Sequence, residues 1–131
     1  MIKQIKSSEI KDFLSTNKNV ELLDVRTQNE WDNVGRPDGK NLGLKTHFVT
    51  IVRSSDPSLN KDFIEEVKKK IDSNKRLLII CKSGGRSMMA SQLLSQESII
   101  CINVSDGFEG NGENVGWKNE GLPSTDIDLN H

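Results

Sequence analysis

Hydrophobic residues in this chain occur in short runs, with few polar residues among them, that alternate with stretches of helical spacing. The runs at residues 20–25, 76–80 and 99–104 are typical of buried strands. Between them, residues 60–71 and 87–96 repeat apolar side chains at the spacing of one helix face. Alternating strands and helices favour a parallel sheet with helices on both sides. The pattern therefore predicts an α/β fold, a three-layer domain with a mostly parallel central sheet flanked by helices.

Weaker patterns indicate shorter elements around this framework. In chain order they are an edge strand at 2–5, a helix capped by Ser7 or Ser8 and ending near Leu14, a helix opened by a capping box at 27–30, a turn at 35–39, a strand around 48–49, a loop at 54–57 and a glycine-rich loop at 106–112. Beyond them, Trp117 and residues 122–123 are expected to pack back onto the body. We therefore expect one domain at residues 1–123 and a C-terminal tail at 124–131.

The composition narrows the class of protein without pointing to a reaction. A length of 131 residues, of which 34% are hydrophobic, suits one domain with a sizeable core. The formal net charge of −1 gives no global field for nucleic acid or an anionic membrane. The first residues lack the apolar core of a signal peptide, and no apolar run approaches the roughly 20 residues that span a bilayer. We therefore expect a cytoplasmic protein that binds neither nucleic acid nor membrane.

Cysteine and histidine are scarce, which limits the roles that they can have. The two cysteines, Cys81 and Cys101, are too few for a disulfide scaffold and have no CxxC spacing. With two histidines in the chain, we expect no structural metal site. Cys101 lies within an apolar run, so we interpret it as a core residue, with a resolving thiol as the alternative.

Cys81 stands where the apolar run 76–80 ends and a helical pattern begins. A short glycine-rich and cationic loop follows it, made of Lys82, Ser83, Gly84, Gly85, Arg86 and Ser87. A cysteine reacts as its thiolate, and a free thiol with a pKa near ~8.5 is mostly protonated at neutral pH. Glycines let successive N–H groups turn inward, a helix N-terminus is positive, and the two cations add charge. We therefore predict a nucleophilic Cys81 in a ring of backbone donors, with an inert core cysteine as the alternative.

The spacing inside the cysteine loop distinguishes between possible reactions. Four residues separate Cys81 from Arg86. Protein tyrosine phosphatases resemble this loop, but theirs holds five residues between the cysteine and the arginine, usually with a histidine before the cysteine. Here Ile80 precedes Cys81. A ring that is one residue shorter has less room for a tetrahedral phosphate and suits a single extra sulfur atom.

The sequence resembles the single-domain rhodaneses, a family of sulfurtransferases, over most of its length. The cysteine loop at 81–87 matches the family's Cys-[Arg/Lys]-x-Gly-x-Arg-Ser signature, and residues 24–31 match its Asp-Val-Arg-x3-Glu-aromatic signature. Residues 107–110 and 116–123 are similar to the C-terminal segment of a bacterial subgroup. At 35–40 the chain reads Gly-Arg-Pro-Asp-Gly-Lys, where the family often has Gly-His-Ile-Pro-Gly-Ala. This difference leaves open which molecule accepts the transferred sulfur.

The resemblance implies a two-step sulfur transfer that needs no cofactor. The Cys81 thiolate would take the outer sulfur of thiosulfate or a similar small donor, and the resulting persulfide would pass it to cyanide, a thiol or a partner protein. The N–H groups of residues 82–86 would hold the terminal sulfur, and Lys82 at the rim would attract an anionic donor. Arg86 either pairs inward, which we favour, or binds the donor. Ser87 is expected to cap the helix, with a hydrogen bond to Cys81 as the alternative.

Residues on neighbouring elements have supporting roles in this interpretation. Asp24 and Arg26 end an adjacent strand, where they can brace the cysteine loop, although a surface ion pair is an equal alternative for Arg26. We interpret Trp31 and Trp117 as packing anchors rather than platforms for a substrate.

Two further classes of function stay open at this stage. A small cysteine phosphatase or arsenate reductase would use the same cradle, and an assay with a small aryl phosphate would distinguish it. A non-enzymatic rhodanese-like module that carries a persulfide or docks a partner would keep the loop but turn over slowly. Rates with thiosulfate against those with thiols or a persulfide donor would separate the carrier from the enzyme.

Overall fold

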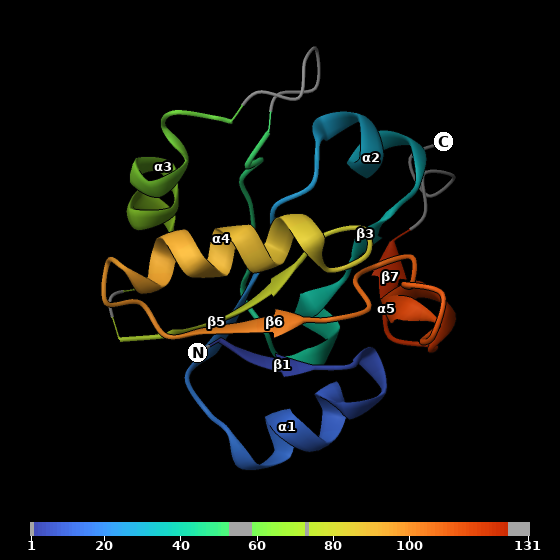
Figure 1. Cartoon of the computed structure of the whole chain (residues 1–131). Coiled ribbons are helices and arrows are strands. Elements are labelled where there is room, and N and C mark those ends of the chain that lie inside the picture. Colours follow the sequence, from blue (N-terminus) through green and yellow to red (C-terminus); the bar gives the residue numbers. More distant parts are fainter. Residues whose placement is uncertain (1, 53–58, 73, 126–131) are drawn as a thin grey trace.

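The computed structural model describes residues 2–52, 59–72 and 74–125, and its centre is a parallel sheet (Figure 1). The predicted loop at 54–57 lies outside the described residues. The strands of the sheet are β1 (Lys3–Ile5), β2 (Val20–Asp24), β4 (Thr46–Phe48), β5 (Arg76–Ile80) and β6 (Cys101–Val104). Their order is β1-β6-β5-β2-β4, and every neighbouring pair is parallel. The prediction of an α/β fold with a mostly parallel sheet is therefore confirmed.

Helices cover both faces of the sheet, which gives the three predicted layers (Figure 1). One face carries α3 (Phe63–Lys70) and α4 (Gly85–Ser95), and the other carries α1 (Ile10–Thr16), the 3-10 turn η1 (Ser7–Glu9) and α5 (Gly116–Asn119). The connection between β2 and β4 contains α2 (Gln28–Asn33), β3 (Arg36–Pro37) and the 3-10 turn η2 (Gly39–Leu42). Within the described residues, no helix is long and apolar enough to cross a lipid bilayer.

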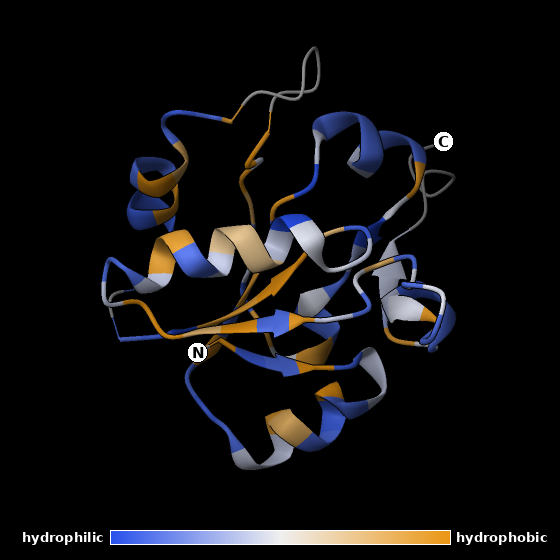
Figure 2. Ribbon diagram, viewed as in Figure 1, coloured by the Kyte–Doolittle hydropathy of each residue, from blue (hydrophilic) through white to orange (hydrophobic). Residues whose placement is uncertain are grey.

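Each face of the sheet has its own hydrophobic core (Figure 2). Successive residues of a strand point to opposite faces, so a strand that is covered on both sides is apolar throughout. In β5, Leu78 lies in the cluster that contains Phe13 of α1, and Leu77 lies in the cluster that contains Val67 of α3 and Leu94 of α4. All three leucines are fully buried. This arrangement explains why the 76–80 run predicts its strand without alternation.

The N-terminal helix is capped differently from the prediction. The residue before α1 is Glu9, and no side chain caps this helix or η1, so the predicted cap at Ser7 or Ser8 is wrong. The backbone N–H and hydroxyl of Ser7 instead both donate to the Asp106 carboxylate at 2.9 Å. Since Asp106 comes from a distant loop, the sequence pattern around Ser7 cannot reveal this partner.

The capping box that opens α2 is confirmed. Glu30 N–H donates to the Thr27 hydroxyl at 3.3 Å, and the Glu30 carboxylate accepts from the Thr27 N–H at 3.2 Å. This reciprocal pair satisfies two donors at the helix start. The box also fixes the Glu30 carboxylate, which has a second partner at the site described below.

The segment predicted as a turn at 35–39 contains a short strand. β3 pairs antiparallel with β7 (Ser124–Thr125), so the predicted tail begins with an ordered strand, and residues 126–131 lie outside the described residues. Gly35 enters β3 with φ +112°, and a Cβ there would lie 2.8 Å from the Thr125 carbonyl oxygen. Trp117 and Leu122 are buried, as predicted, and the Trp117 indole N–H donates to the Pro123 carbonyl at 2.7 Å.

Candidate active site

Cys81 lies at the carboxyl edge of the sheet, directly after β5. The neighbouring strand β2 runs parallel to β5 and ends at Asp24, which pairs in register with Ile80. The Val25 N–H donates to the Ile80 carbonyl at 3.0 Å, so the ladder continues to the last residue of β5, directly before Cys81. Loops at this edge of an open parallel sheet are where ligand sites form. Cys81 is 1% exposed, so its sulfur lies almost entirely inside the protein.

Gly84 makes the sharp turn between the strand and α4. Its φ is +102°, and a Cβ there would lie 2.3 Å from the Ser105 carbonyl oxygen. In this conformation the Gly84 N–H points at the Cys81 sulfur, with N and Sγ 3.1 Å apart. Gly85 is already the first residue of α4, which begins before the predicted start at Ser87. Among the described residues, Gly84 is thus the one loop residue whose N–H donates to this sulfur.

Ser87 lies on the buried side of α4 and faces the sulfur. Its hydroxyl oxygen is 3.2 Å from Cys81 Sγ and 2.5 Å from Asn103 Oδ1. The residue before α4 is Gly84, so the prediction that Ser87 caps this helix is wrong, and the alternative, a direct bond to Cys81, is what the structure has.

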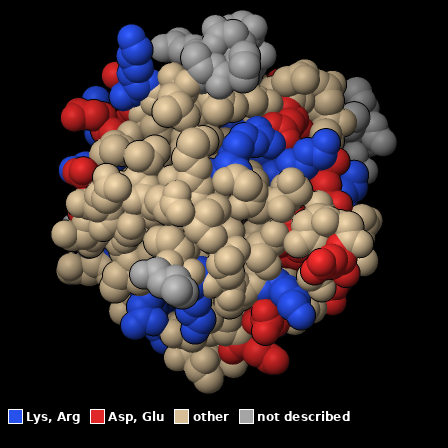
Figure 3. Space-filling model, in the orientation of Figure 1, with Lys and Arg blue, Asp and Glu red and all other residues tan. Residues whose placement is uncertain are grey.

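Arg86 turns back toward the protein and pairs with Glu30 of α2. Both terminal nitrogens bind the carboxylate, Nη1 at 2.7 Å and Nη2 at 2.9 Å. Burial raises the pKa of Glu30, but the hydrogen bonds from Arg86 and Thr27 outweigh it and lower that pKa to about 2. The hydrogen bond with Glu30 raises the pKa of Arg86. Figure 3 shows charged side chains gathered where α2 meets the start of α4.

Lys82 and Ser83 form the outer part of the cysteine loop. Both are exposed, whereas Cys81, Gly84 and Ser87 are buried. Lys82 therefore stands at the rim, where its charge can act on an incoming anion without a fixed ion pair among the described residues.

A second loop clamps the cysteine loop from the side of β6. We refer to residues 107–109 as the clamp. The Phe108 N–H donates to the Cys81 carbonyl at 2.8 Å, and the Glu109 N–H donates to the Lys82 carbonyl at 2.9 Å. A Cβ on Gly107 would lie 2.3 Å from the Lys82 carbonyl oxygen, so this position accepts only glycine. The clamp satisfies both carbonyls and thereby fixes the direction of the peptide groups beside the sulfur.

Asp24 and Arg26 form a fully buried ion pair behind the loop. Arg26 Nε and Nη2 bind the Asp24 carboxylate at 3.1 and 2.8 Å, and Nη2 also donates to the Gly35 carbonyl. The guanidinium carbon lies 4.4 Å from the centre of the Phe108 ring. Arg26 is therefore no surface ion pair, and it supports the cysteine loop through the clamp.

The other residues considered from sequence lie in packed surroundings. Cys101 is buried on the α4 side of the sheet, and burial raises the pKa of its thiol to about 11, as expected of a core cysteine. The Trp31 ring packs edge-on against Phe48. Trp117 is fully buried in the core on the α1 side of the sheet. These contacts agree with packing roles for both tryptophans.

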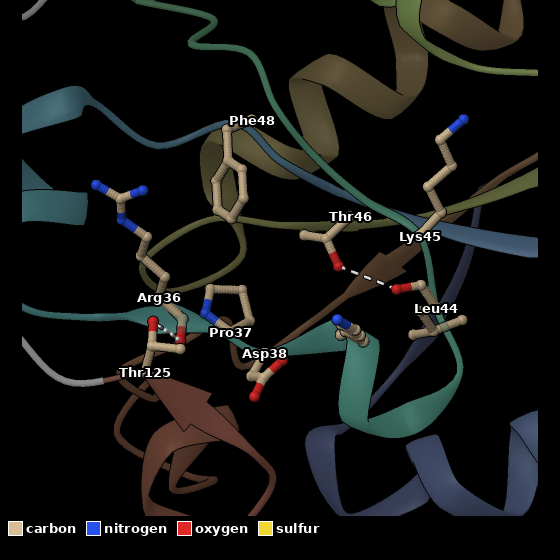
Figure 4. A pocket seen from close by; sticks show the side chains of 10 residues that line it. Arg36, Pro37, Asp38, Leu44, Lys45, Thr46, Phe48 and Thr125 are labelled. Carbon is tan, nitrogen blue, oxygen red and sulfur yellow. Dashed lines mark hydrogen bonds between the residues drawn. The ribbon is translucent and has the colours of Figure 1, made fainter. Parts of the chain in front are cut away.

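A separate pocket of about 520 Å³ lies between β3, η2 and β4 (Figure 4). Its walls include Arg36, Pro37 and Phe48, with the Arg36 guanidinium 5.7 Å from the centre of the Phe48 ring. Lys45 and Thr46 border the other side in Figure 4. No residue of the cysteine loop lines it, so the pocket is distinct from the Cys81 site. Across the described ranges, no group of at least three His, Cys, Asp and Glu side chains is placed to hold a metal ion.

Sequence reasoning did not assign three residues that contact the loop: Glu30, Asn103 and Phe108. Glu30 was assigned to the capping box and to the signature at 24–31, but not to a contact with the cysteine loop, and its carboxylate binds Arg86. Asn103 carries a usable signal, since it is a polar residue within the apolar run 99–104. Phe108 contacts the cysteine loop through its backbone N–H, and no side-chain pattern can indicate such a contact.

Comparisons with known proteins agree with this geometry. The model of the rhodanese-like domain matches residues 7–114. An uncharacterized protein of Rickettsia prowazekii is 36% identical, over 94% of this chain and 97% of its own. The crystal structure of Rv0390 from M. tuberculosis is 32% identical with a TM-score of 0.82, over 93% of this chain and 96% of that one. The polysulfide-sulfur transferase homodimer of Wolinella succinogenes shares the fold, with a TM-score of 0.64, 23% identity and coverage of 95% and 79%.

The fold and the site define a class of α/β protein in which a buried cysteine follows a central parallel strand and faces the start of a helix. Within that class, this chain belongs to the rhodanese-like domain family. The family is of the sulfurtransferase type, as the resemblance of its two signatures predicts.

Proposed function

We propose that this protein is a thiosulfate sulfurtransferase that works through a persulfide on Cys81. The observation that carries the proposal is the position of Cys81 Sγ, 3.1 Å from the Gly84 N–H at the beginning of α4. A backbone donor and the positive end of a helix stabilise a sulfur anion at this point. The similar structure from Wolinella succinogenes is a polysulfide-sulfur transferase, which supports sulfur as the transferred group.

In the first step, the Cys81 thiolate attacks the outer sulfur of thiosulfate. A bond forms between Sγ and that sulfur, the bond to the sulfonate sulfur breaks, and sulfite leaves with the electron pair. Lys82 at the rim attracts the dianionic donor. The loop between Cys81 and Arg86 is one residue shorter than that of the tyrosine phosphatases and leaves less room for a tetrahedral phosphate, which favours sulfur transfer over a phosphatase reaction.

In the second step, the acceptor attacks the terminal sulfur of the persulfide. With cyanide, a carbon–sulfur bond forms, the sulfur–sulfur bond breaks, and the thiolate of Cys81 returns together with thiocyanate. The N–H groups at the start of α4 stabilise the charge on the terminal sulfur between the two steps. In a cytoplasmic setting we propose a thiol or a partner protein as acceptor, and neither nucleic acid nor membrane as partner.

The test is to incubate the reduced protein with thiosulfate and measure its mass. We expect one added sulfur on Cys81, which cyanide removes as thiocyanate, and steady-state turnover of thiosulfate with cyanide. Cys81→Ser should abolish both the adduct and the turnover, because it removes the nucleophile. Activity retained in Cys81→Ser would refute the assignment.

Cys101→Ser provides the matched control. Since Cys101 is buried and burial raises the pKa of its thiol to about 11, this substitution should leave the adduct in place. Hydrolysis of an aryl phosphate without sulfur uptake would favour the phosphatase alternative. Sulfur uptake with negligible turnover would favour a persulfide carrier.

A further inference from the structure

The hydroxyl group of Ser87 stands between two possible hydrogen-bond acceptors. Its oxygen lies 3.2 Å from Cys81 Sγ and 2.5 Å from Asn103 Oδ1. A serine hydroxyl has one proton to donate, so it can serve only one of the two. Ser87 is fully buried and Asn103 is 1% exposed, so bulk water does not take the place of either partner.

The orientation of the Asn103 amide is fixed by its other contacts. Its Nδ2 group donates to the Gly84 carbonyl at 3.2 Å and to Gln4 Oε1 at 3.0 Å. The Gly84 carbonyl can only accept a hydrogen bond, so the nitrogen side of the amide must face it. Oδ1 therefore faces Ser87, and this oxygen in turn can only accept.

The direction of the Ser87 proton follows from this arrangement. Two oxygens 2.5 Å apart need a proton between them, and only Ser87 can supply it. The hydroxyl then presents a lone pair to Cys81 Sγ, which suits a neutral S–H donor and disfavours a thiolate. We propose that Asn103 is a positioning residue, which holds the Ser87 proton away from Cys81 and so withholds one hydrogen bond from the Cys81 thiolate.

The proposal deepens the proposed function, because it rests on Cys81 being the reactive group. It assigns control of the sulfur's charge to a β6 side chain that does not touch the sulfur itself. The charged groups around the site are the same in all the variants below: Lys82 and Arg86 on the loop and α4, Asp24 and Glu30 on the β2 side, and Asp106 and Glu109 after β6. Changes in pH dependence between these variants therefore report on Ser87 and Asn103.

The experiment measures the rate at which iodoacetamide alkylates Cys81 between pH 5.5 and 9, with the adduct mapped by mass spectrometry. In Asn103→Leu the competing acceptor is gone, so Ser87 donates to the thiolate. We expect alkylation at pH 6.5 to be about tenfold faster than in the unaltered protein, the effect of one buried hydrogen bond. The acceleration should vanish in the double variant Asn103→Leu/Ser87→Ala. A profile equal to that of the unaltered protein, or an acceleration that persists without Ser87, would overturn the proposal.

Two further variants keep the test decisive. Gln4→Leu removes the outer contact of Asn103 but leaves the Gly84 contact, so its alkylation profile should not change. Ser87→Ala alone should be alkylated as fast as the unaltered protein or faster, because its proton does not serve the sulfur. Slower alkylation would mean that Ser87 donates to Cys81, which contradicts the proposal even if Asn103→Leu fails to fold.

Alkylation does not involve sulfur transfer, so the two ideas can fail separately. A protein that shows the expected Asn103 effect but takes no sulfur from thiosulfate would refute the proposed function alone. A protein that takes up sulfur on Cys81 but shows no Asn103 effect would refute only the role of Asn103.

Discussion

Arg86 shows how a partner far away in the chain decides the role of a single residue. Its position five residues after Cys81 leaves two roles open, pairing inward or binding the sulfur donor. Both terminal nitrogens of the guanidinium donate to the Glu30 carboxylate. Arg86 therefore pairs inward, which is the role that the sequence favours. Because Glu30 also belongs to the capping box of α2, this pair joins two helix starts at the site.

The Glu30–Arg86 pair predicts a particular acid sensitivity. The pKa of Glu30 is about 2 in the folded protein, below its ordinary value of 4.5, so its stabilising effect is complete above pH 4.5 and disappears as the pH falls toward 2. We expect Glu30→Gln, which keeps the shape of the capping box, to lower the free energy of unfolding by about 1 kcal/mol at pH 7, since solvent screens this half-buried pair. Urea unfolding at several pH values measures the difference, which should shrink below pH 4.5 and close only below pH 2.

The surface pair Lys68–Glu97 supplies the control for this prediction. Its side chains are 49% and 34% exposed, so Glu97→Gln should change stability by less than about 0.5 kcal/mol at pH 7. A Glu30→Gln difference that is the same at pH 3 and pH 7 would contradict the assigned ionisation.

At the scale of elements, the two adjacent glycines of the cysteine loop have different roles. Sequence alone treats Gly84 and Gly85 alike, as residues that let the loop curl. Only Gly84 has a left-handed backbone and a close neighbour, whereas a Cβ on Gly85 would meet nothing within 4 Å. Gly85 is an ordinary first residue of α4.

Substitution of the two glycines by alanine should therefore have unequal effects. Gly84→Ala strains the backbone and places a methyl group against the Ser105 carbonyl, so we expect a loss of about 2 to 4 kcal/mol in the free energy of unfolding. Gly85→Ala should be neutral or slightly stabilising, because alanine favours a helix over glycine. Guanidinium unfolding of both variants measures this contrast. Equal losses would show that the turn does not depend on Gly84.

The elements that the sequence predicts well are those whose signal is local. Residues 76–80 form an apolar run that ends at the cysteine, and the strand has those bounds. The segment at 35–39 reads as a turn because its partner β7 is about ninety residues away. The sequence predicts the start of α4 at Ser87, but the helix begins at Gly85. The left-handed conformation of Gly84, rather than a capping side chain, ends the loop.

At the scale of the whole molecule, Arg26 joins three parts of the fold. It binds Asp24 at the end of β2, the Gly35 carbonyl before β3, and the ring of Phe108 in the clamp. All of this is buried, so the charge of Arg26 is balanced only by these contacts.

Removal of this arginine should therefore destabilise the entire domain. We expect Arg26→Met to lower the free energy of unfolding by about 3 to 5 kcal/mol, because it leaves the buried Asp24 carboxylate without a cationic partner and with only the backbone N–H of residue 26. Arg36→Met is the matched control, since the Arg36–Asp32 pair is 41% and 53% exposed and should contribute less than about 1 kcal/mol. Chemical unfolding followed by tryptophan fluorescence measures both, and similar losses would contradict the role of Arg26.

The candidate site divides in the same way into local and distant parts. The loop at 81–87 could be predicted because its strand, glycines and cations are contiguous in the sequence. Glu30, Asn103 and the clamp reach the loop from separate segments, through contacts that only the packed fold creates. The sequence predicts the cysteine loop, and the fold shows which residues hold it in place.

The clamp has a consequence for protein engineering. Two carbonyl groups of the cysteine loop depend on N–H groups that lie more than twenty residues further along the chain. A heptapeptide copied from 81–87 into another scaffold would therefore carry the cysteine, but its backbone would not keep the conformation of the loop. A successful transplant would have to bring residues 103–109 as a second graft, held against the first by an equivalent pair of parallel strands.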